Sequence, residues 1–464
     1  MRRPCLLGAL LVGALFFCVS LFLTVDVRAE AGADLLEEGR QSAQAGELSS
    51  ALLSFSAYKQ EHPNDPRPYL YSGMALLKAG RGRDAAIELD EAAARGLSEA
   101  GDAIEYARGR MELGNLREAA RALAEWEESD RLPAEGLWVL SDIHYRLKEA
   151  QDAQRVFEKF AARQPDDPRV NLRRGQIYIY LEEYEKALTS LEHAVWANPE
   201  SPEAHFEMAR TLYYGINFEA GKKVAAKAVA LDPDNPEYLH LLGITCDRLE
   251  QYDEAVSHLE KAAELPGAFN RIYFDLGNAL RKAGNTARAQ EVLKTYRSLH
   301  QESEAQANRD KIIEALLNQG RLQIQQGDIG AGRSSFLRVL EQDPDDWLAN
   351  SFLAKIYLSS GRGRLAQPHV DKLLELAPDS SEAHYLAAMY WRQARDASKA
   401  LSHAEESKRL RPGDAELRNL LGNLYFALGQ WEEAAQEYAA AVGLAPDRLD
   451  FQANHKTALK KLNR

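Results

Sequence analysis

The feature that most limits how this sequence can fold is a period of 34 residues. One pattern of small, aromatic and large apolar residues begins at 32, 66, 100, 134, 168, 202, 236 and 270, and resumes at 313, 347, 381 and 415. The step from 270 to 313 is longer than the others, so nine residues are inserted there. A fixed period of this length predicts a stacked array of identical supersecondary units.

Two positions of the repeat indicate what each unit is. Positions 8 and 20 of all twelve repeats hold Gly, Ala or Ser, as at Gly175 with Ala187 and at Gly422 with Ala434. Two antiparallel helices approach closely only where the facing side chains are small. Many repeats end in Pro followed by Asp, Glu or Ser, which stops one helix and caps the next. The sequence therefore predicts pairs of antiparallel helices and no sheet.

This pattern resembles the tetratricopeptide repeat family over nearly all of the chain after residue 31. The repeats that begin at 168, 236 and 415 follow the family pattern well. Those that begin at 32 and 100 depart from it, since Ser42 and Arg110 stand where a large apolar residue is expected. The resemblance implies an all-α fold, a right-handed α-solenoid superhelix of about twelve helix-turn-helix repeats with a concave groove.

The repeat frame divides the chain into blocks. We expect eight repeats in residues 32–303 and four repeats in residues 313–448. The insertion at 304–312 is polar and lacks Gly and Pro, so we expect it to lengthen a helix. The last segment, residues 449–464, is amphipathic, and we expect it to form a capping helix.

The N-terminal segment, residues 1–31, differs from the repeats. Residues 4–25 are an uncharged apolar run behind Arg2 and Arg3, and small residues follow at Ala29 and Ala31. This arrangement is typical of an export signal, but the run is also long enough to span a bilayer. A cleaved signal and an uncleaved membrane anchor through residues 4–25 are both open. Either alternative predicts an extracytoplasmic protein of the bacterial periplasm or cell envelope.

Catalytic and metal-binding patterns are absent from the sequence. The eleven His residues include no pair three or four positions apart, and no Cys cluster, H-E-x-x-H or G-x-S-x-G motif occurs. Cys5 and Cys18 lie in the N-terminal segment, and Cys246 stands at position 11 of its repeat, where we expect a buried core thiol. The repeats leave no segment for a catalytic domain. The sequence therefore predicts no enzyme activity, no cofactor and no metal.

The charge of the chain points away from nucleic acid. There are 70 acidic and 57 basic residues, a formal net charge of −13. Nucleic-acid binding depends on neutralising phosphates with Lys and Arg, so an acidic chain disfavours it. We expect the partners to be other proteins.

In the tetratricopeptide family the first helix of each unit lines the groove, and here that helix is rich in aromatic residues and Arg. This composition is typical of protein-binding hot spots. The candidate groove residues are Trp138, Tyr145, Arg173, Tyr180, Phe206, Arg210, Tyr213, Tyr214, His240, Arg248, Phe274, Arg281, Tyr385 and Arg392. The same aromatic residues could instead pack between neighbouring helices, and this alternative stays open.

These observations predict a non-enzymatic protein–protein interaction scaffold or adaptor of the cell envelope, which binds partner segments in its concave groove. Two other functions stay open. One is an accessory subunit that holds substrate for an envelope enzyme such as a transferase, and the other is a periplasmic chaperone.

Overall fold

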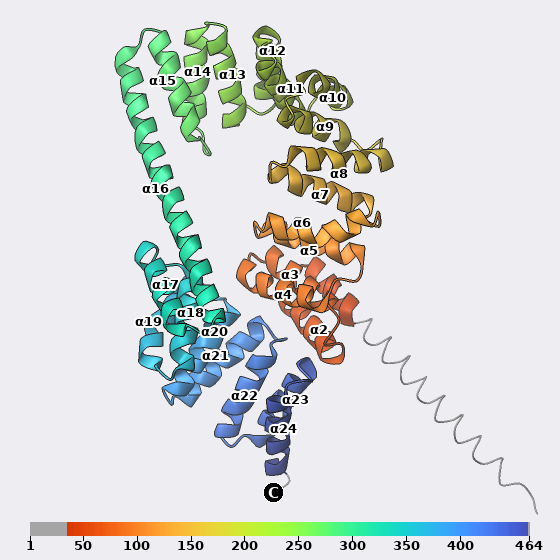
Figure 1. Ribbon diagram of the computed structural model, residues 1–464, viewed down its shortest axis with the longest axis vertical. Helices are drawn as coiled ribbons and strands as arrows, with labels where there is room; N and C mark the ends of the chain where they lie inside the picture. Colours follow the sequence, from red (N-terminus) through yellow and green to blue (C-terminus); the bar gives the residue numbers. More distant parts are fainter. Residues whose placement is uncertain (1–34, 463–464) are drawn as a thin grey trace, which may run out of the picture. The chain divides into compact units, whose positions relative to one another are not determined.

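The computed structural model describes residues 35–462, and within that range every regular element is a helix (Figure 1). The predicted all-α repeat fold is confirmed. The helices divide into two compact units, which are described separately. Unit 1 combines the described residues up to Gly114 with those from Ile313 onward, and unit 2 is Asn115–Ile312.

Unit 1 contains a first helix over residues 35–44 and twelve further helices. Their bounds are α2 (Leu48–Glu61), α3 (Arg67–Lys78), α4 (Gly82–Arg95), α5 (Ala100–Glu112), α17 (Ile329–Gln342), α18 (Trp347–Ser359), α19 (Gly363–Leu376), α20 (Ser381–Gln393), α21 (Ala397–Leu410), α22 (Ala415–Ala427), α23 (Trp431–Leu444) and α24 (Leu449–Leu462). The last of these packs on α23 through Phe451 and Ala458, which are buried.

Unit 2 contains ten consecutive helices in residues 116–282, of which the first completes the third repeat, the last begins the eighth repeat, and the eight between them form four pairs. Their bounds are α6 (Leu116–Glu128), α7 (Ala134–Arg146), α8 (Ala150–Arg163), α9 (Arg169–Tyr180), α10 (Tyr184–Ala197), α11 (Pro202–Tyr214), α12 (Phe218–Leu231), α13 (Pro236–Arg248), α14 (Tyr252–Glu264) and α15 (Asn270–Lys282). The 40-residue helix α16 (Thr286–Gln325) begins in unit 2 and ends in unit 1.

The expected insertion lies inside α16, where the side chains of residues 301–312 are all exposed. This helix serves as the second helix of the eighth pair and the first helix of the ninth. The two units do not coincide with the repeat blocks 32–303 and 313–448, because residues 35–114 pack with the C-terminal repeats. A repeat pattern cannot foresee such a grouping, since it reports only neighbours along the chain.

Side-chain caps begin many of the helices, as the residues after each Pro suggested. The side-chain oxygens of Ser201, Asn235, Asp346, Ser380 and Asp414 each accept a hydrogen bond from a backbone N–H in the first turn of the next helix. These bonds satisfy donors that the helix itself leaves unpaired. The local sequence therefore sets where each first helix begins.

The small residues at position 8 mark the closest approach of the two helices in a pair. A Cβ atom added to Gly175 would lie 2.4 Å from Leu191 Cγ, and one added to Gly422 would lie 2.5 Å from the Tyr438 ring. At position 20, Ala187 is fully buried. The predicted close helix–helix crossing is confirmed. It sets the orientation of each first helix, and thereby of the face that points away from the second helix and carries the candidate groove residues.

Among the helices of residues 35–462, none combines the length and the apolar character needed to span a bilayer. Residues 4–25, the expected signal or anchor, lie outside the described residues.

Candidate functional site

The fourteen candidate groove residues all lie on first helices of helix pairs. Twelve belong to unit 2 and two to unit 1. They are Trp138 and Tyr145 on α7, Arg173 and Tyr180 on α9, Phe206, Arg210, Tyr213 and Tyr214 on α11, His240 and Arg248 on α13, Phe274 and Arg281 on α15, and Tyr385 and Arg392 on α20.

On α7 and α9 these residues contact one another across neighbouring repeats. The Arg173 guanidinium lies 5.1 Å from the Trp138 ring and 4.7 Å from the Tyr145 ring, and its Nη2 is 2.8 Å from a carboxylate oxygen of Asp142. Tyr145 meets Tyr180 edge to face at 4.8 Å. Burial raises the pKa of Tyr145 to about 12. Trp138, Tyr145 and Arg173 therefore serve mainly to pack α7 against α9. Tyr180 is 45% exposed and stays accessible to a partner.

Two residues of α11 are also engaged in packing. Arg210 Nη2 is 2.7 Å from Glu207 Oε2, and Glu207 is buried. The Gln176 amide donates to Glu207 Oε1 at 3.3 Å. The Phe206 ring lies 4.8 Å from the Tyr238 ring on the next first helix. Removal of Arg210 would leave a buried carboxylate without its cation, so this residue is a poor probe of binding.

A hollow of about 650 Å³ lies between α11, α13 and α15 of unit 2. Its lining includes five candidate residues: Tyr213, Tyr214, His240, Arg248 and Arg281. Tyr213 and Tyr214 meet edge to face at 5.8 Å, and Tyr214 is 50% exposed. The Arg248 guanidinium lies 5.7 Å from the Tyr213 ring. The structure thus brings together aromatic faces and accessible guanidinium groups.

The lining of this hollow is positively charged although the whole chain is acidic. Its charged side chains, leaving His240 aside, are four cations and two carboxylates: Arg248, Arg271, Arg281, Lys282, Asp247 and Asp275. Each carboxylate is already paired. Asp247 Oδ2 lies 2.6 Å from Lys282 Nζ, and Asp275 Oδ2 lies 2.8 Å from His240 Nε2 and 3.0 Å from Arg271 Nε. Arg248 and Arg281 are exposed and can meet an incoming carboxylate.

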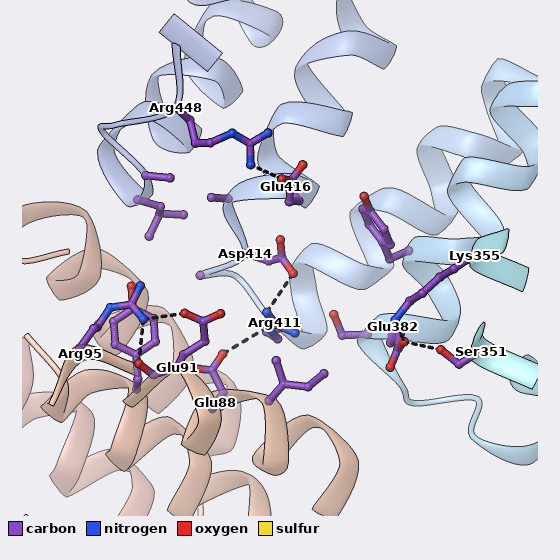
Figure 2. A pocket seen from close by; sticks show the side chains of 18 of the residues that line it. Glu88, Glu91, Arg95, Ser351, Lys355, Glu382, Arg411, Asp414, Glu416 and Arg448 are labelled. Carbon is purple, nitrogen blue, oxygen red and sulfur yellow. Dashed lines mark hydrogen bonds and ion pairs between the residues drawn. The ribbon is translucent and has the colours of Figure 1, made fainter. Parts of the chain in front are cut away.

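Tyr385 lines a different pocket, of about 600 Å³, within unit 1 (Figure 2). Burial raises the pKa of Tyr385 to about 12. Charged side chains from α4 and from the C-terminal repeats surround this pocket and pair with one another. The pairs are Arg95–Glu91 at 2.5 Å, Lys355–Glu382 at 2.5 Å, Arg411–Asp414 at 3.0 Å and Arg448–Glu416. Arg392 is exposed and does not belong to the lining.

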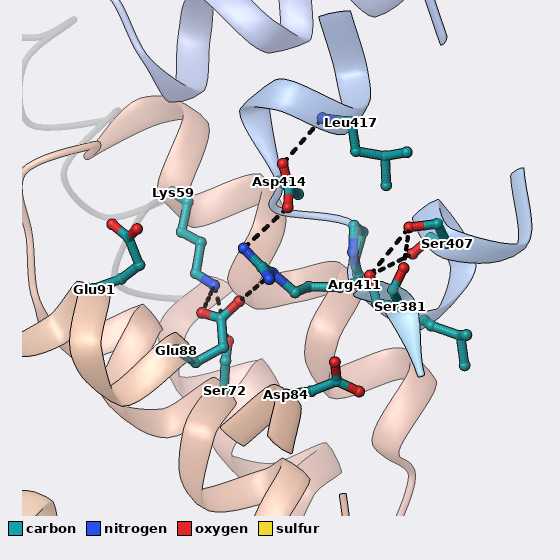
Figure 3. A network of polar contacts seen from close by, with 12 residues as sticks. Lys59, Ser72, Asp84, Glu88, Glu91, Ser381, Ser407, Arg411, Asp414 and Leu417 are labelled. Atoms are coloured by element: carbon teal, nitrogen blue, oxygen red, sulfur yellow. Dashed lines mark hydrogen bonds and ion pairs between the residues drawn. The ribbon is translucent and has the colours of Figure 1, made fainter. Parts of the chain in front are cut away.

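A buried charge network beside this pocket joins the N-terminal and C-terminal segments of unit 1 (Figure 3). Lys59 Nζ donates to Glu88 Oε2 at 2.6 Å and to Ser72 Oγ at 3.1 Å. The other Glu88 oxygen lies 3.2 Å from Arg411 Nε, and Arg411 also pairs with Asp414. We call these five residues the clasp. Burial lowers the pKa of Lys59, and the Glu88 carboxylate opposes that shift.

Two further contacts support the clasp. The Arg81 guanidinium donates to the Leu410 carbonyl at 3.2 Å, and the Arg83 guanidinium lies 4.4 Å from the Trp347 ring. Burial raises the pKa of Asp84, and Arg81, which bonds it at 2.5 Å, opposes the shift.

Comparison with protein families decides which repeat this is. Models of the tetratricopeptide repeat match residues 104–168, 144–202, 206–269, 323–390 and 392–448, which together span more than half of the chain. The chain belongs to the tetratricopeptide repeat family. Tetratricopeptide repeats suggest a protein–protein interaction scaffold, and this coarse function applies here.

Several curated proteins match this chain at low identity. The human protein O-mannosyl-transferase TMTC1 is 26% identical over 39% of this chain and 20% of its own length. The human antiviral innate immune response effector IFIT1 is 26% identical over 57% of this chain and 66% of its own. Cellulose synthase operon protein C of Pseudomonas fluorescens is 28% identical over 37% of this chain and 14% of its own. The chain thus spans less than two thirds of each of these relatives.

Solved tetratricopeptide structures also align. MamA from Desulfovibrio magneticus is 27% identical, with 36% of this chain and 96% of its own aligned at a TM-score of 0.34. The Cut9–Hcn1 hetero-tetramer of the APC/C is 11% identical, with 92% of this chain and 96% of its own aligned at a TM-score of 0.30.

The clasp escaped the sequence analysis, although one signal was available in the repeat frame. Lys59 stands at position 28, which is apolar in eight of the twelve repeats, as at Val195, Val229 and Leu374, and charged in three others, at Glu127, Arg297 and Lys408. A charge at a position that is mostly apolar indicates either exposure or a special partner. Its partner Glu88 lies in the adjacent repeat, but Arg411, which completes the clasp, lies in a distant repeat that the repeat frame does not relate to either residue.

Proposed function

We propose that this chain is a non-enzymatic scaffold of the cell envelope, and that the hollow between α11, α13 and α15 binds an acidic segment of a partner protein that carries one large apolar or aromatic side chain. The observation that carries the proposal is the hollow's lining. It combines an accessible Tyr214 with Arg248 and Arg281, and its net charge is positive. Tyr and Arg dominate the residues that contribute most to protein binding.

The chemistry of the partner follows from that lining. Arg248 and Arg281 can each hold a carboxylate through two parallel hydrogen bonds. The half-exposed ring of Tyr214 offers an apolar face at little entropic cost. An acidic segment with one large apolar side chain satisfies both requirements.

The envelope location rests on the sequence of residues 1–31. An apolar run behind two arginines, followed by small residues, supports export or anchoring outside the cytoplasm. N-terminal sequencing of the protein recovered from fractionated cells distinguishes the two. Cleavage near residue 29 indicates a signal, an intact N-terminus in the membrane fraction indicates an anchor, and recovery in the cytoplasm contradicts the location.

The binding proposal is tested with the variant Tyr214→Ala/Arg248→Ala/Arg281→Ala, in which the removed side chains are exposed. A matched control is Trp196→Ala/Arg297→Ala/Arg309→Ala, which removes one aromatic residue and two exposed Arg residues elsewhere in unit 2. Crosslinking of intact cells followed by mass spectrometry should recover an acidic partner segment with the wild type and the control. The hollow variant should lose that crosslink while its helical circular dichroism is unchanged. Equal recovery by both variants would show that the hollow is not the binding surface.

A second candidate function is an accessory role beside a transferase. It is favoured by the names of two relatives, a protein O-mannosyl-transferase and a cellulose synthase operon protein. A co-purifying transferase whose activity falls in the hollow variant would favour this role. Broad capture of unrelated unfolded proteins would instead favour a chaperone.

A further inference from the structure

The two helices of each repeat bring three side-chain positions together. Position 11 of the first helix faces positions 19 and 23 of the second. In the repeat that begins at 347, the Tyr357 ring stacks on the His369 ring at 5.8 Å, which joins positions 11 and 23. In the repeat that begins at 381, Lys399 Nζ lies 4.0 Å from the Trp391 ring, which joins positions 19 and 11. The register therefore allows side chains at these three positions to contact one another within a helix pair.

The seventh repeat fills all three positions with metal-ligand residues. Cys246 stands at position 11 on α13, and Glu254 and His258 stand at positions 19 and 23 on α14. No other repeat of the chain has Cys, His, Asp or Glu at all three positions. The thiol sulfur, one carboxylate oxygen and one imidazole nitrogen all lie within 4.8 Å of one another. Glu254 and His258 are one helical turn apart, so both point to the same side of α14.

Cys246 also leaves more room than its neighbours do. The repeats on either side carry Leu212 and Leu280 at the same position, and their side chains are larger than a thiol. The Cys246 thiol is free and has no exposed surface. The expectation of a buried thiol is thus confirmed, and this thiol lies beside two other ligand side chains.

The three donors differ in exposure. Cys246 is fully buried, His258 is half-buried and Glu254 is exposed. Lys222 on α12 lies 2.7 Å from Glu254 Oε2, so a bound cation would compete with this ammonium group for the carboxylate. A thiol binds a metal as the thiolate, so the Cys246 proton must leave when a cation binds.

We propose that Cys246, Glu254 and His258 bind one divalent cation of the Zn²⁺ class. A thiolate, an imidazole and a carboxylate suit a borderline-soft ion, whereas Mg²⁺ and Ca²⁺ prefer all-oxygen sites. Binding releases the thiol proton to solvent and moves the Lys222 ammonium away from Glu254. Three protein ligands leave a fourth position for water or for a donor from a partner.

A second group of ligand types, His144, Glu149 and Asp152, lies in the fourth repeat. It lacks a sulfur ligand, and His144 Nδ1 is already 2.7 Å from Glu149 Oε2. Any metal bound there would have a spectrum without a sulfur contribution, so the two groups can be told apart.

The test uses the full-length protein, stripped with a chelator and titrated with Co²⁺. One equivalent should bind with a sulfur-to-cobalt charge-transfer band, and Zn²⁺ should displace it. The variants Cys246→Leu and His258→Val introduce the residues that the eighth repeat carries at the same positions, so both should keep the helix pair. Cys246→Leu should abolish the band, and His258→Val should weaken Co²⁺ binding. Lys222→Gln removes a competing cation and should lower the Co²⁺ dissociation constant by about tenfold.

Circular dichroism of each variant separates loss of the site from loss of the fold. A wild-type protein that binds Co²⁺ without the sulfur band, or that binds none at micromolar concentration, overturns the proposal. A band that persists in Cys246→Leu also overturns it. These outcomes are independent of the partner-binding hollow, because none of the three ligands belongs to its lining.

Discussion

Replacing Glu88 by Gln removes the carboxylate that contacts both Lys59 and Arg411 in the clasp. The side chains of Lys59 and Glu88 are each 3% exposed, and their charged atoms are 2.6 Å apart. Water therefore cannot take over the role of the lost charge. The variant tests whether the clasp holds the two segments of unit 1 together.

The expected cost follows from the burial of Lys59. Removal of one partner of a buried ion pair typically costs about 3–5 kcal/mol, because the other charge is left without compensation. Arg411 keeps its contact with Asp414, so we expect the lower end of this range, about 3 kcal/mol. The double variant Lys59→Met/Glu88→Gln removes the stranded cation and should recover most of the loss.

Hydrogen exchange measured by mass spectrometry reports this loss of stability separately for each helix. A local loss of about 3 kcal/mol accelerates exchange of the most protected amides by roughly a hundredfold. The acceleration should appear in α2–α4 and α21–α22, while α7–α14 of unit 2 serve as the internal reference. The reasoning is refuted if exchange in unit 1 is unchanged, if unit 2 responds equally, or if the double variant recovers nothing.

Three further predictions concern the repeats themselves. Gly175→Ala should lower the free energy of unfolding by about 1–3 kcal/mol in urea titrations, because the new Cβ would lie 2.4 Å from Leu191 Cγ. Gly101→Ala has no atom within 4 Å of the new Cβ and should instead raise that free energy by about 0.4–1 kcal/mol; equal effects of the two variants would contradict the close crossing. The hydrogen bond from Arg169 lowers the pKa of Asp167, so this carboxylate contributes stability above its ordinary pKa and loses it as pH falls through the lowered value. In NMR titrations Arg169→Gln should raise the pKa of Asp167, and an unmoved value would exclude this pairing in solution.

The helix pairs were predictable because the residues that define them are local. A small residue at position 8, such as Gly175, and another twelve positions later, such as Ala187, encode one helix crossing within a single repeat. The Asp or Ser residues that cap the next helix lie within the same 34 residues. Each repeat thus contains enough information to specify its own fold.

The sequence placed the candidate groove residues on the first helices, but it could not tell which of them pack between helices and which stay exposed. Arg173 lies over the Trp138 ring and pairs with a carboxylate, whereas Arg281 is exposed at the edge of a hollow. Both were candidate groove residues because each shares a helix face with aromatic residues. What distinguishes them is the set of side chains on the neighbouring repeat, which a pattern within one repeat does not contain. Whether either residue touches a partner stays a prediction.

The clasp was out of reach for a related reason. The clasp joins Glu88 to Arg411, and the supporting Arg81–Leu410 hydrogen bond joins residues 329 positions apart, so no periodic signal relates the two segments. The proposed metal site has no His pair on one helix, which is the pattern that a sequence reveals directly. Its ligands come from two helices, and they meet only once the register between positions 11, 19 and 23 is known.

The clasp and the proposed metal site both use position 23 of the repeat. This suggests that a tetratricopeptide chain can gain an ion pair or a ligand site by a substitution at that position. Position 23 holds Glu88 in the second repeat and His258 in the seventh, while Val224 and Val292 occupy it in repeats that flank the seventh. The position is buried at Glu88 and half-buried at Val224, His258 and Val292, so a polar residue there is costly unless it finds a partner. In the clasp that partner is Lys59, and in the seventh repeat we propose that it is a cation. Because the small residues at positions 8 and 20 maintain the helix crossing independently, position 23 can change without loss of the fold. Exchange of His258 for the Val of a neighbouring repeat should therefore weaken cation binding and leave the helix pair intact.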